Sequence, residues 1–132
     1  MGFVKLGLSV GIAATALIAG LQAPASAEEY LWISGGYGLW QADPESGRPG
    51  DSIKACDTSS DGWAISVVMT WGDATGYRQV DTRGHEAGYC SGWASGNLPE
   101  GTYVDISVEE IKSDGKGGLL HRNWQLFRDR VA

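Results

Sequence analysis

Few side chains in this 132-residue chain could carry out acid–base or nucleophilic chemistry, and their spacing matches no catalytic motif. The two histidines, His85 and His121, are the side chains best suited to act as a general base near neutral pH. His85 precedes Glu86, but position 89 is Tyr89, so the HExxH motif of zinc peptidases is incomplete. His121 falls on the polar side of a predicted strand, where a solvent-exposed histidine needs no special role. The histidines therefore indicate no active site.

The two cysteines, Cys56 and Cys90, are the only thiols available for covalent catalysis or for binding a soft metal ion. They do not form a CxxC pair, and residues 88–92 lack the GxSxG spacing of a nucleophile elbow. Two cysteines and two histidines are also too few for a Cys/His zinc site unless carboxylates contribute. We therefore expect a protein that is not an enzyme and that holds no metal and no cofactor.

The 16 Asp and Glu side chains leave two carboxylate functions to consider, glycoside hydrolysis and calcium binding. A glycosidase pair needs a cleft, and a chain of this size offers little depth for one. Residues 57–62 supply two carboxylates, Asp57 and Asp61, but lack the ligand spacing and the bidentate Glu of an EF-hand. An Asx turn before a strand accounts for the same residues. Surface charge is the simpler interpretation, while calcium binding at Asp57 and Asp61 stays open.

Residues 1–27 match a secretory signal peptide. Lys5 is their only charged residue, an uncharged run follows over residues 6–21, and Ala-Ser-Ala at 25–27 is a pattern that signal peptidase accepts. The run is shorter than the roughly 20 residues of a membrane-spanning helix. We therefore predict cleavage after Ala27 and a secreted product without a membrane anchor.

The mature chain would have 105 residues, a formal charge of −7 and all six tryptophans. This acidic charge argues against binding to a nucleic-acid backbone, and the length accommodates one domain. Export into an oxidising compartment predicts that Cys56 and Cys90 form a disulfide.

Alternating apolar and polar residues predict an all-β fold, a small antiparallel β-sandwich (Ig-like or jelly-roll-like) of six to seven strands with one disulfide, over residues 51–132. No long window has helical spacing, because Gly or Pro interrupts each one. The clearest strand covers residues 63–71. Further strands are predicted over residues 52–57, 77–82, 89–93, 102–111 and 120–126. The predicted disulfide then joins strands 52–57 and 89–93 across the two sheets.

Residues 28–50 differ from the rest, since they are rich in aromatic side chains, broken by glycines, and followed by a linker-like run at 44–50. One alternative for residues 28–41 is a first strand that completes a sheet. The other is an arm that projects from the domain and docks into a partner by strand addition or by filling a pocket. Aromatic side chains suit a core and an interface equally well.

The tryptophans divide into two predicted groups. Trp63, Trp71 and Trp124 are expected in the core because they lie on apolar strand faces, whereas Trp93, near two glycines, is expected to be partly exposed. Exposed aromatic rings can stack on sugars or anchor a protein partner. The predicted partner-binding residues are Tyr30, Trp32, Tyr37, Trp40 and Trp93.

The turns around the cysteines resemble those of small exported single-disulfide proteins of filamentous actinobacteria, and this resemblance covers most of the mature chain. It rests on Gly50-Asp51, Ala55-Cys56-Asp57, Asp61-Gly62-Trp63, Gly84-His85, Gly88-Tyr89-Cys90 and Leu98-Pro99-Glu100-Gly101. Some proteins of this kind are similar to the adaptor subunits of secreted, lectin-bearing umbrella toxin particles. That resemblance implies that an extended N-terminal segment, here Tyr30 to Trp40, joins a lectin-like subunit while the body docks on the large toxin chain.

Three functions are compatible with these observations. The leading hypothesis is a secreted, non-enzymatic protein-binding module, an adaptor in an extracellular toxin-type assembly. The alternative is a carbohydrate-binding module that uses exposed Trp and Tyr side chains. A protease inhibitor that presents the loop 82–88 is the third. The sequence identifies neither the partner or ligand nor the oligomeric state.

Overall fold

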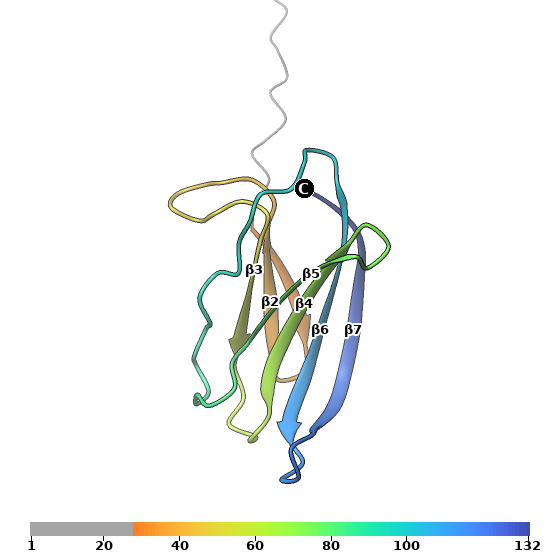
Figure 1. Ribbon diagram of the computed structural model, residues 1–132. Helices are drawn as coiled ribbons and strands as arrows, with labels where there is room; N and C mark the ends of the chain where they lie inside the picture. The colour runs from red at the N-terminus through yellow and green to blue at the C-terminus, as the bar shows by residue number, and fades with distance from the viewer. Residues whose placement is uncertain (1–27) are drawn as a thin grey trace, which may run out of the picture.

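The computed structural model describes residues 28–132, which fold into seven β-strands and contain no helix (Figure 1). The strands are β1 (Glu29–Ile33), β2 (Gly36–Gln41), β3 (Ser52–Asp57), β4 (Ala64–Trp71), β5 (Gly76–Asp81), β6 (Tyr103–Ser113) and β7 (Leu119–Val131). The predicted signal peptide, residues 1–27, lies outside the described residues. Within residues 28–132, no helix is long and apolar enough to cross a membrane.

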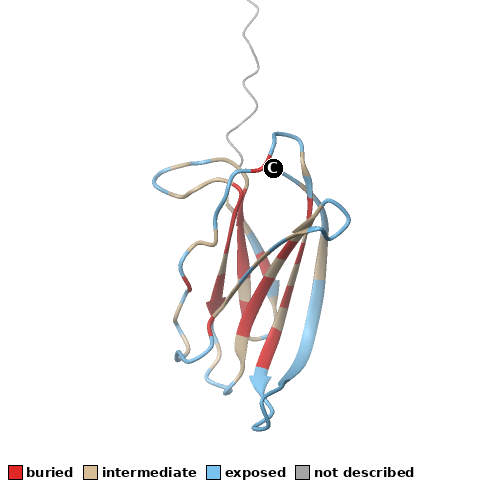
Figure 2. Cartoon of the chain, in the orientation of Figure 1, coloured by how far each residue is buried: buried red, intermediate tan, exposed pale blue. Residues whose placement is uncertain are grey.

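The strands form two antiparallel sheets that pack face to face, β1-β2-β3 and β5-β4-β6-β7. This arrangement confirms the predicted all-β sandwich. Its core is the layer between the sheets, and Figure 2 shows the buried residues concentrated on the strands. In the paired strands β4 and β6, Val67 lies opposite Val108 and Met69 opposite Ile106, and all four are fully buried.

The N-terminal aromatic segment belongs to the first sheet. β1 and β2 form a hairpin through Gly35, whose φ of 91° suits a glycine, and β2 pairs along its whole length with β3. Leu31 and Trp40 are buried in the core, which anchors both strands. The structure thus shows the strand alternative for residues 28–41 and not a projecting arm. The predicted division between residues 28–50 and 51–132 falls between two hydrogen-bonded strands of one sheet.

The disulfide between Cys56 and Cys90 forms as predicted, but its expected position across the two sheets is wrong. Residues 89–94 run beside β3 and hydrogen-bond to it, for example from Ser91 N to Ala55 O at 2.8 Å and from Ala94 N to Ile53 O at 2.8 Å. Residues 89–93 make only isolated bridges to β3 and no full strand. The long connection between β5 and β6 therefore covers the edge of β3, and the disulfide fixes it there.

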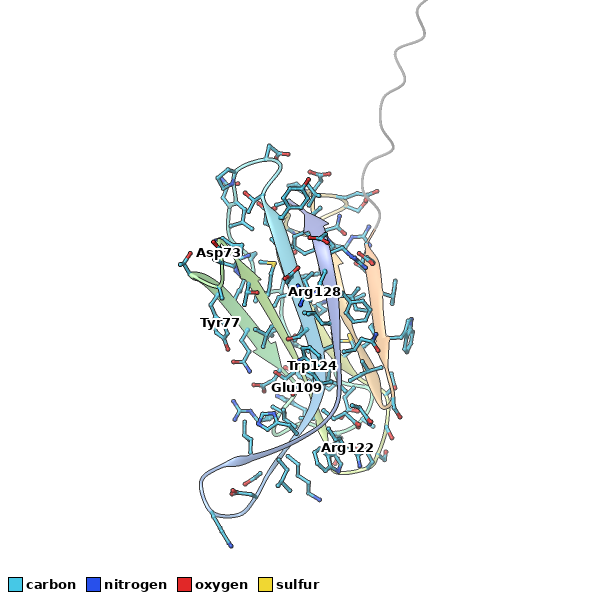
Figure 3. The ribbon with its side chains drawn as sticks, turned by 90° about the vertical axis from the view of Figure 1, so that its right-hand side faces the viewer. Asp73, Tyr77, Glu109, Arg122, Trp124 and Arg128 are labelled. Carbon is cyan, nitrogen blue, oxygen red and sulfur yellow. A yellow bond between two sulfur atoms is a disulfide. The ribbon has the colours of Figure 1, made fainter. Side chains whose placement is uncertain are left out.

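The predicted core position of Trp124 is also wrong, because its side chain is 60% exposed. Asn123, just before it, has a φ of 54°, and the pairing of β7 with β6 shifts register between Val108 and Glu110. This bulge inserts one residue, so the alternation reverses and Phe127 takes the place against the core. Figure 3 shows Arg122, Trp124 and Arg128 along β7.

Glu110 is an unexpected charged residue in the interior, with only 1% of its surface exposed. Arg122 binds it in a bidentate manner, with Nε to Oε2 at 2.9 Å and Nη2 to Oε1 at 3.1 Å, and the Asn123 amide also donates to Oε2. Arg122 Nη2 also reaches Asp61 at 2.9 Å. These contacts offset the free-energy cost of burying the Glu110 carboxylate at one end of the sandwich.

Replacing both cysteines by alanine should lower the free energy of unfolding by about 3–4 kcal/mol, because the bridge closes a loop with a sequence separation of 34 and restricts the unfolded chain. Urea denaturation of the Cys56→Ala/Cys90→Ala protein against the oxidised parent measures this difference. A loss below about 1 kcal/mol would show that the backbone hydrogen bonds of residues 89–94 suffice to hold the connection.

Candidate functional site

The outer side of the β1-β2-β3 sheet carries a cluster of aromatic rings, which we call the aromatic face: Tyr30 and Trp32 of β1, Tyr37 of β2, and Trp93 beside β3. Strand alternation places them there, since Leu31, between Tyr30 and Trp32, points into the core. Trp32 lies directly opposite Tyr37 in the register, so their side chains share the outer side. The sheet thus brings together four of the five predicted partner-binding residues.

The rings of the β1–β2 hairpin pack against one another although they face solvent. The centroids of Trp32 and Tyr37 are 4.4 Å apart, those of Tyr30 and Tyr37 are 5.3 Å apart, and Tyr30 and Trp32 lie 6.3 Å apart with an angle of 14° between their planes. Tyr30 remains 52% exposed and Trp32 58% exposed. Their mutual contacts restrict the rings to a defined arrangement, while more than half of each surface stays accessible.

Trp93 extends the aromatic face beyond β3. Lys54, on the outer side of that strand, holds its ammonium group 4.8 Å from the centroid of the Trp93 ring, a cation–π contact. The neighbouring Ala94 packs against the core, so Trp93 points outward, half-buried. The position of this ring depends on the disulfide-linked segment that covers the β3 edge.

Trp40, the fifth predicted binding residue, does not belong to the aromatic face. It lies opposite Ile53 in β3 and is only 4% exposed, within the core. Trp40 and Tyr37 are three positions apart in β2, so their side chains point to opposite sides of the strand. The side chain of Trp40 faces the core between the sheets, and that of Tyr37 faces outward. The sequence pattern could have separated the two residues once the turn at Gly35 was fixed.

One acidic side chain, Glu28, borders the aromatic face where β1 begins, whereas Glu29 shares the inner side of β1 with Leu31. Glu28 forms an ion pair with Arg48 at 3.2 Å, and Glu29 with Arg130 of β7 at 2.6 Å. The charge of Glu28, together with a hydrogen bond to it, raises the pKa of the Tyr30 phenol, because a nearby carboxylate disfavours the phenolate. The Tyr30 phenol therefore stays neutral beside the Glu28–Arg48 ion pair.

The other predicted candidates lie elsewhere and do not assemble a catalytic set. His85 stacks on Tyr89, with ring centroids 3.5 Å apart, and His121 pairs with Glu109 at 3.2 Å on the outer side of the larger sheet. Asp61 accepts hydrogen bonds from Arg122 and from the backbone of Trp63, so a cation there would have to displace an arginine. Among residues 28–132 no group of three or more His, Cys, Asp and Glu side chains is placed to hold a metal ion.

Comparison with known proteins gives no family for this chain: no protein-family model, no curated protein and no solved structure matches it.

The Glu28→Gln substitution should lower the pKa of Tyr30 towards its ordinary value, since the negative charge that opposes ionisation is removed. Titration of the tyrosine ring carbons by NMR follows this pKa directly. Glu100→Gln, in an exposed turn, is the matched control and should leave Tyr30 unchanged. An unchanged Tyr30 pKa in the Glu28→Gln protein would contradict the described contact.

Proposed function

We propose that this chain is an exported, non-enzymatic protein-binding module whose aromatic face docks on an extracellular protein partner. The observation that carries the proposal is the exposure of Tyr30 and Trp32, 52% and 58%, in rings already packed against Tyr37. Buried in an interface, large aromatic side chains dominate the binding energy of many complexes. A soluble domain gains nothing from exposing such a cluster unless something covers it.

A protein is the occupant that this face fits best. The rings sit on paired strands and are ordered before binding, so little side-chain entropy is lost on association. Their faces can accept apolar side chains and the cations of Lys or Arg. The mature charge of −7 favours a partner surface that is apolar at its centre and basic at its rim.

The same surface supports the proposal of an adaptor role. A signal peptide and a disulfide both fit an extracellular protein, and the resemblance to adaptor subunits of toxin particles points to an assembly with two partners. In the toxin adaptors an N-terminal arm makes one of these contacts. Here residues 29–41 are held in the sheet, so we assign that contact to the aromatic face, which the same residues form.

Substituting Trp32 by alanine should weaken partner capture by about ten-fold or more, because it removes the most exposed ring of the face. The mature protein, tagged and immobilised, is used to capture proteins from culture supernatant of the producing organism, and the affinity of the captured protein is then measured. Trp124→Ala is the matched control, because Trp124 is equally exposed (60%) but lies on β7, outside the aromatic face.

Three results would contradict the proposal. One is capture that survives Trp32→Ala and Tyr30→Ala. Another is capture lost equally in the Trp124→Ala protein. The third is binding of the face to polysaccharide or to a second copy of the chain, detected by glycan pull-down and by sedimentation, in place of a protein partner.

A further inference from the structure

A groove of about 760 Å³ opens at one end of the sandwich, apart from the aromatic face. It lies where β3 and β5 end, between the loop that leads into β4 and the loop that follows β5, and the last residues of β6 form its floor. No residue of the aromatic face lines it. Its volume is in the range of sites that bind small molecules.

Asp57 gives this groove a fixed hydrogen-bond acceptor. The residue is only 5% exposed, and its Oδ1 accepts the backbone N–H of Ser59 at 3.0 Å. Among residues 28–132 nothing donates to Oδ2, although Asp57 lines the groove. Oδ2 is not itself buried, so it is accessible from the groove, where a ligand hydroxyl group can donate a hydrogen bond to it.

Trp63 gives the groove an apolar ring whose position is set by neighbouring cations. The guanidinium of Arg122 lies 4.1 Å from the centroid of the ring, and Arg122 is itself held by the buried Glu110 and by Asp61. Lys112 stands 5.9 Å from the same ring at the groove. An indole fixed in this way presents a flat apolar surface, to which the C–H groups of a sugar ring can stack.

The charges of the lining favour a neutral ligand. Both signs of charge line the groove, from the carboxylates of Asp57 and Glu86 and the cations of Lys112 and Arg83. Arg83 is also paired with Asp81, which lies outside the lining, at 3.0 Å. Three serines, Ser59, Ser60 and Ser113, add hydroxyl groups that both donate and accept. A phosphate would meet the Asp57 carboxylate, and a bare cation would find a single buried carboxylate.

We propose that this end groove is a saccharide site, in which a neutral hexose or hexosamine unit stacks on Trp63 and donates a hydroxyl hydrogen bond to Oδ2 of Asp57. The site is independent of the proposed docking of a protein on the aromatic face, since it shares no residue with it. The protein would then bind a glycan in the groove at the end of the sandwich and a protein partner on the aromatic face.

Binding is measured by saturation-transfer NMR and calorimetry on the mature protein, with cellobiose, maltose, lactose and N,N′-diacetylchitobiose as probes. Asp57→Asn is the sharpest variant. The asparagine oxygen can keep the hydrogen bond from Ser59, and the amide NH₂ then replaces Oδ2, so that a donor stands where the acceptor was. Asp73→Asn, in an exposed turn, is its matched control.

Affinity for the bound disaccharide should fall about ten-fold or more in Asp57→Asn and in Trp63→Ala, the effect of losing one anchoring contact. It should be unchanged in Asp73→Asn and in Trp124→Ala. Thermal melting checks that each variant is folded, and Trp63→Phe, which keeps an aromatic ring and should bind more strongly than Trp63→Ala, is used if the alanine variant unfolds. Absence of binding to all four sugars, or binding unaffected by Asp57→Asn and by loss of the Trp63 indole, would overturn the proposal.

Discussion

The close contact between the two sheets at Gly38 is the constraint on which the rest of the structure depends. A Cβ atom at this position of β2 would lie 3.0 Å from methyl carbons of both Val67 and Val108. The absence of a side chain therefore lets β2 approach β4 and β6 directly, and Leu31 and Trp40 fill the space on either side. Because β2 is fixed in this way, β1 follows it as a hairpin, and the outward side chains of both strands acquire their positions.

Two charged contacts complement this apolar layer at its two ends. At the end where the described chain starts and finishes (Figure 1), Arg130 of β7 donates three hydrogen bonds to Glu29 of β1 and ties the last strand to the first. At the opposite end, the buried carboxylate of Glu110 lies beside the turn at Gly35, and the more exposed Arg122 binds it. Partial exposure limits what the first pair contributes to stability, whereas the second is needed because Glu110 is buried.

The sequence predicts the strands well where alternation is regular and fails where the backbone departs from it. Residues 52–57 and 63–71 coincide closely with β3 and β4, since each has a strongly apolar side. Trp124 was misplaced because a bulge at Asn123 has no signature in the spacing of apolar residues. The pairing of Cys56 with Cys90 could be predicted, but the predicted placement of the bond across the two sheets is wrong, since a disulfide implies proximity and not which sheet edge the second cysteine lies beside. Of the candidate site, the residue types could be predicted, whereas the grouping of Trp93 with the β1–β2 hairpin needed the tertiary fold. In the sequence, Asp57 is a possible calcium ligand and Trp63 an expected core residue, and only the fold places both in the lining of one groove.

The disulfide-linked segment 89–94 has a consequence for how the molecule meets other chains. By donating to and accepting from β3, it occupies the backbone groups that an incoming strand would use, and the positive-φ residues Asn123 and Asp129 break the regular pattern of β7. With the edge of β3 filled and that of β7 interrupted, neither strand offers a regular edge for a strand of a second chain to pair with.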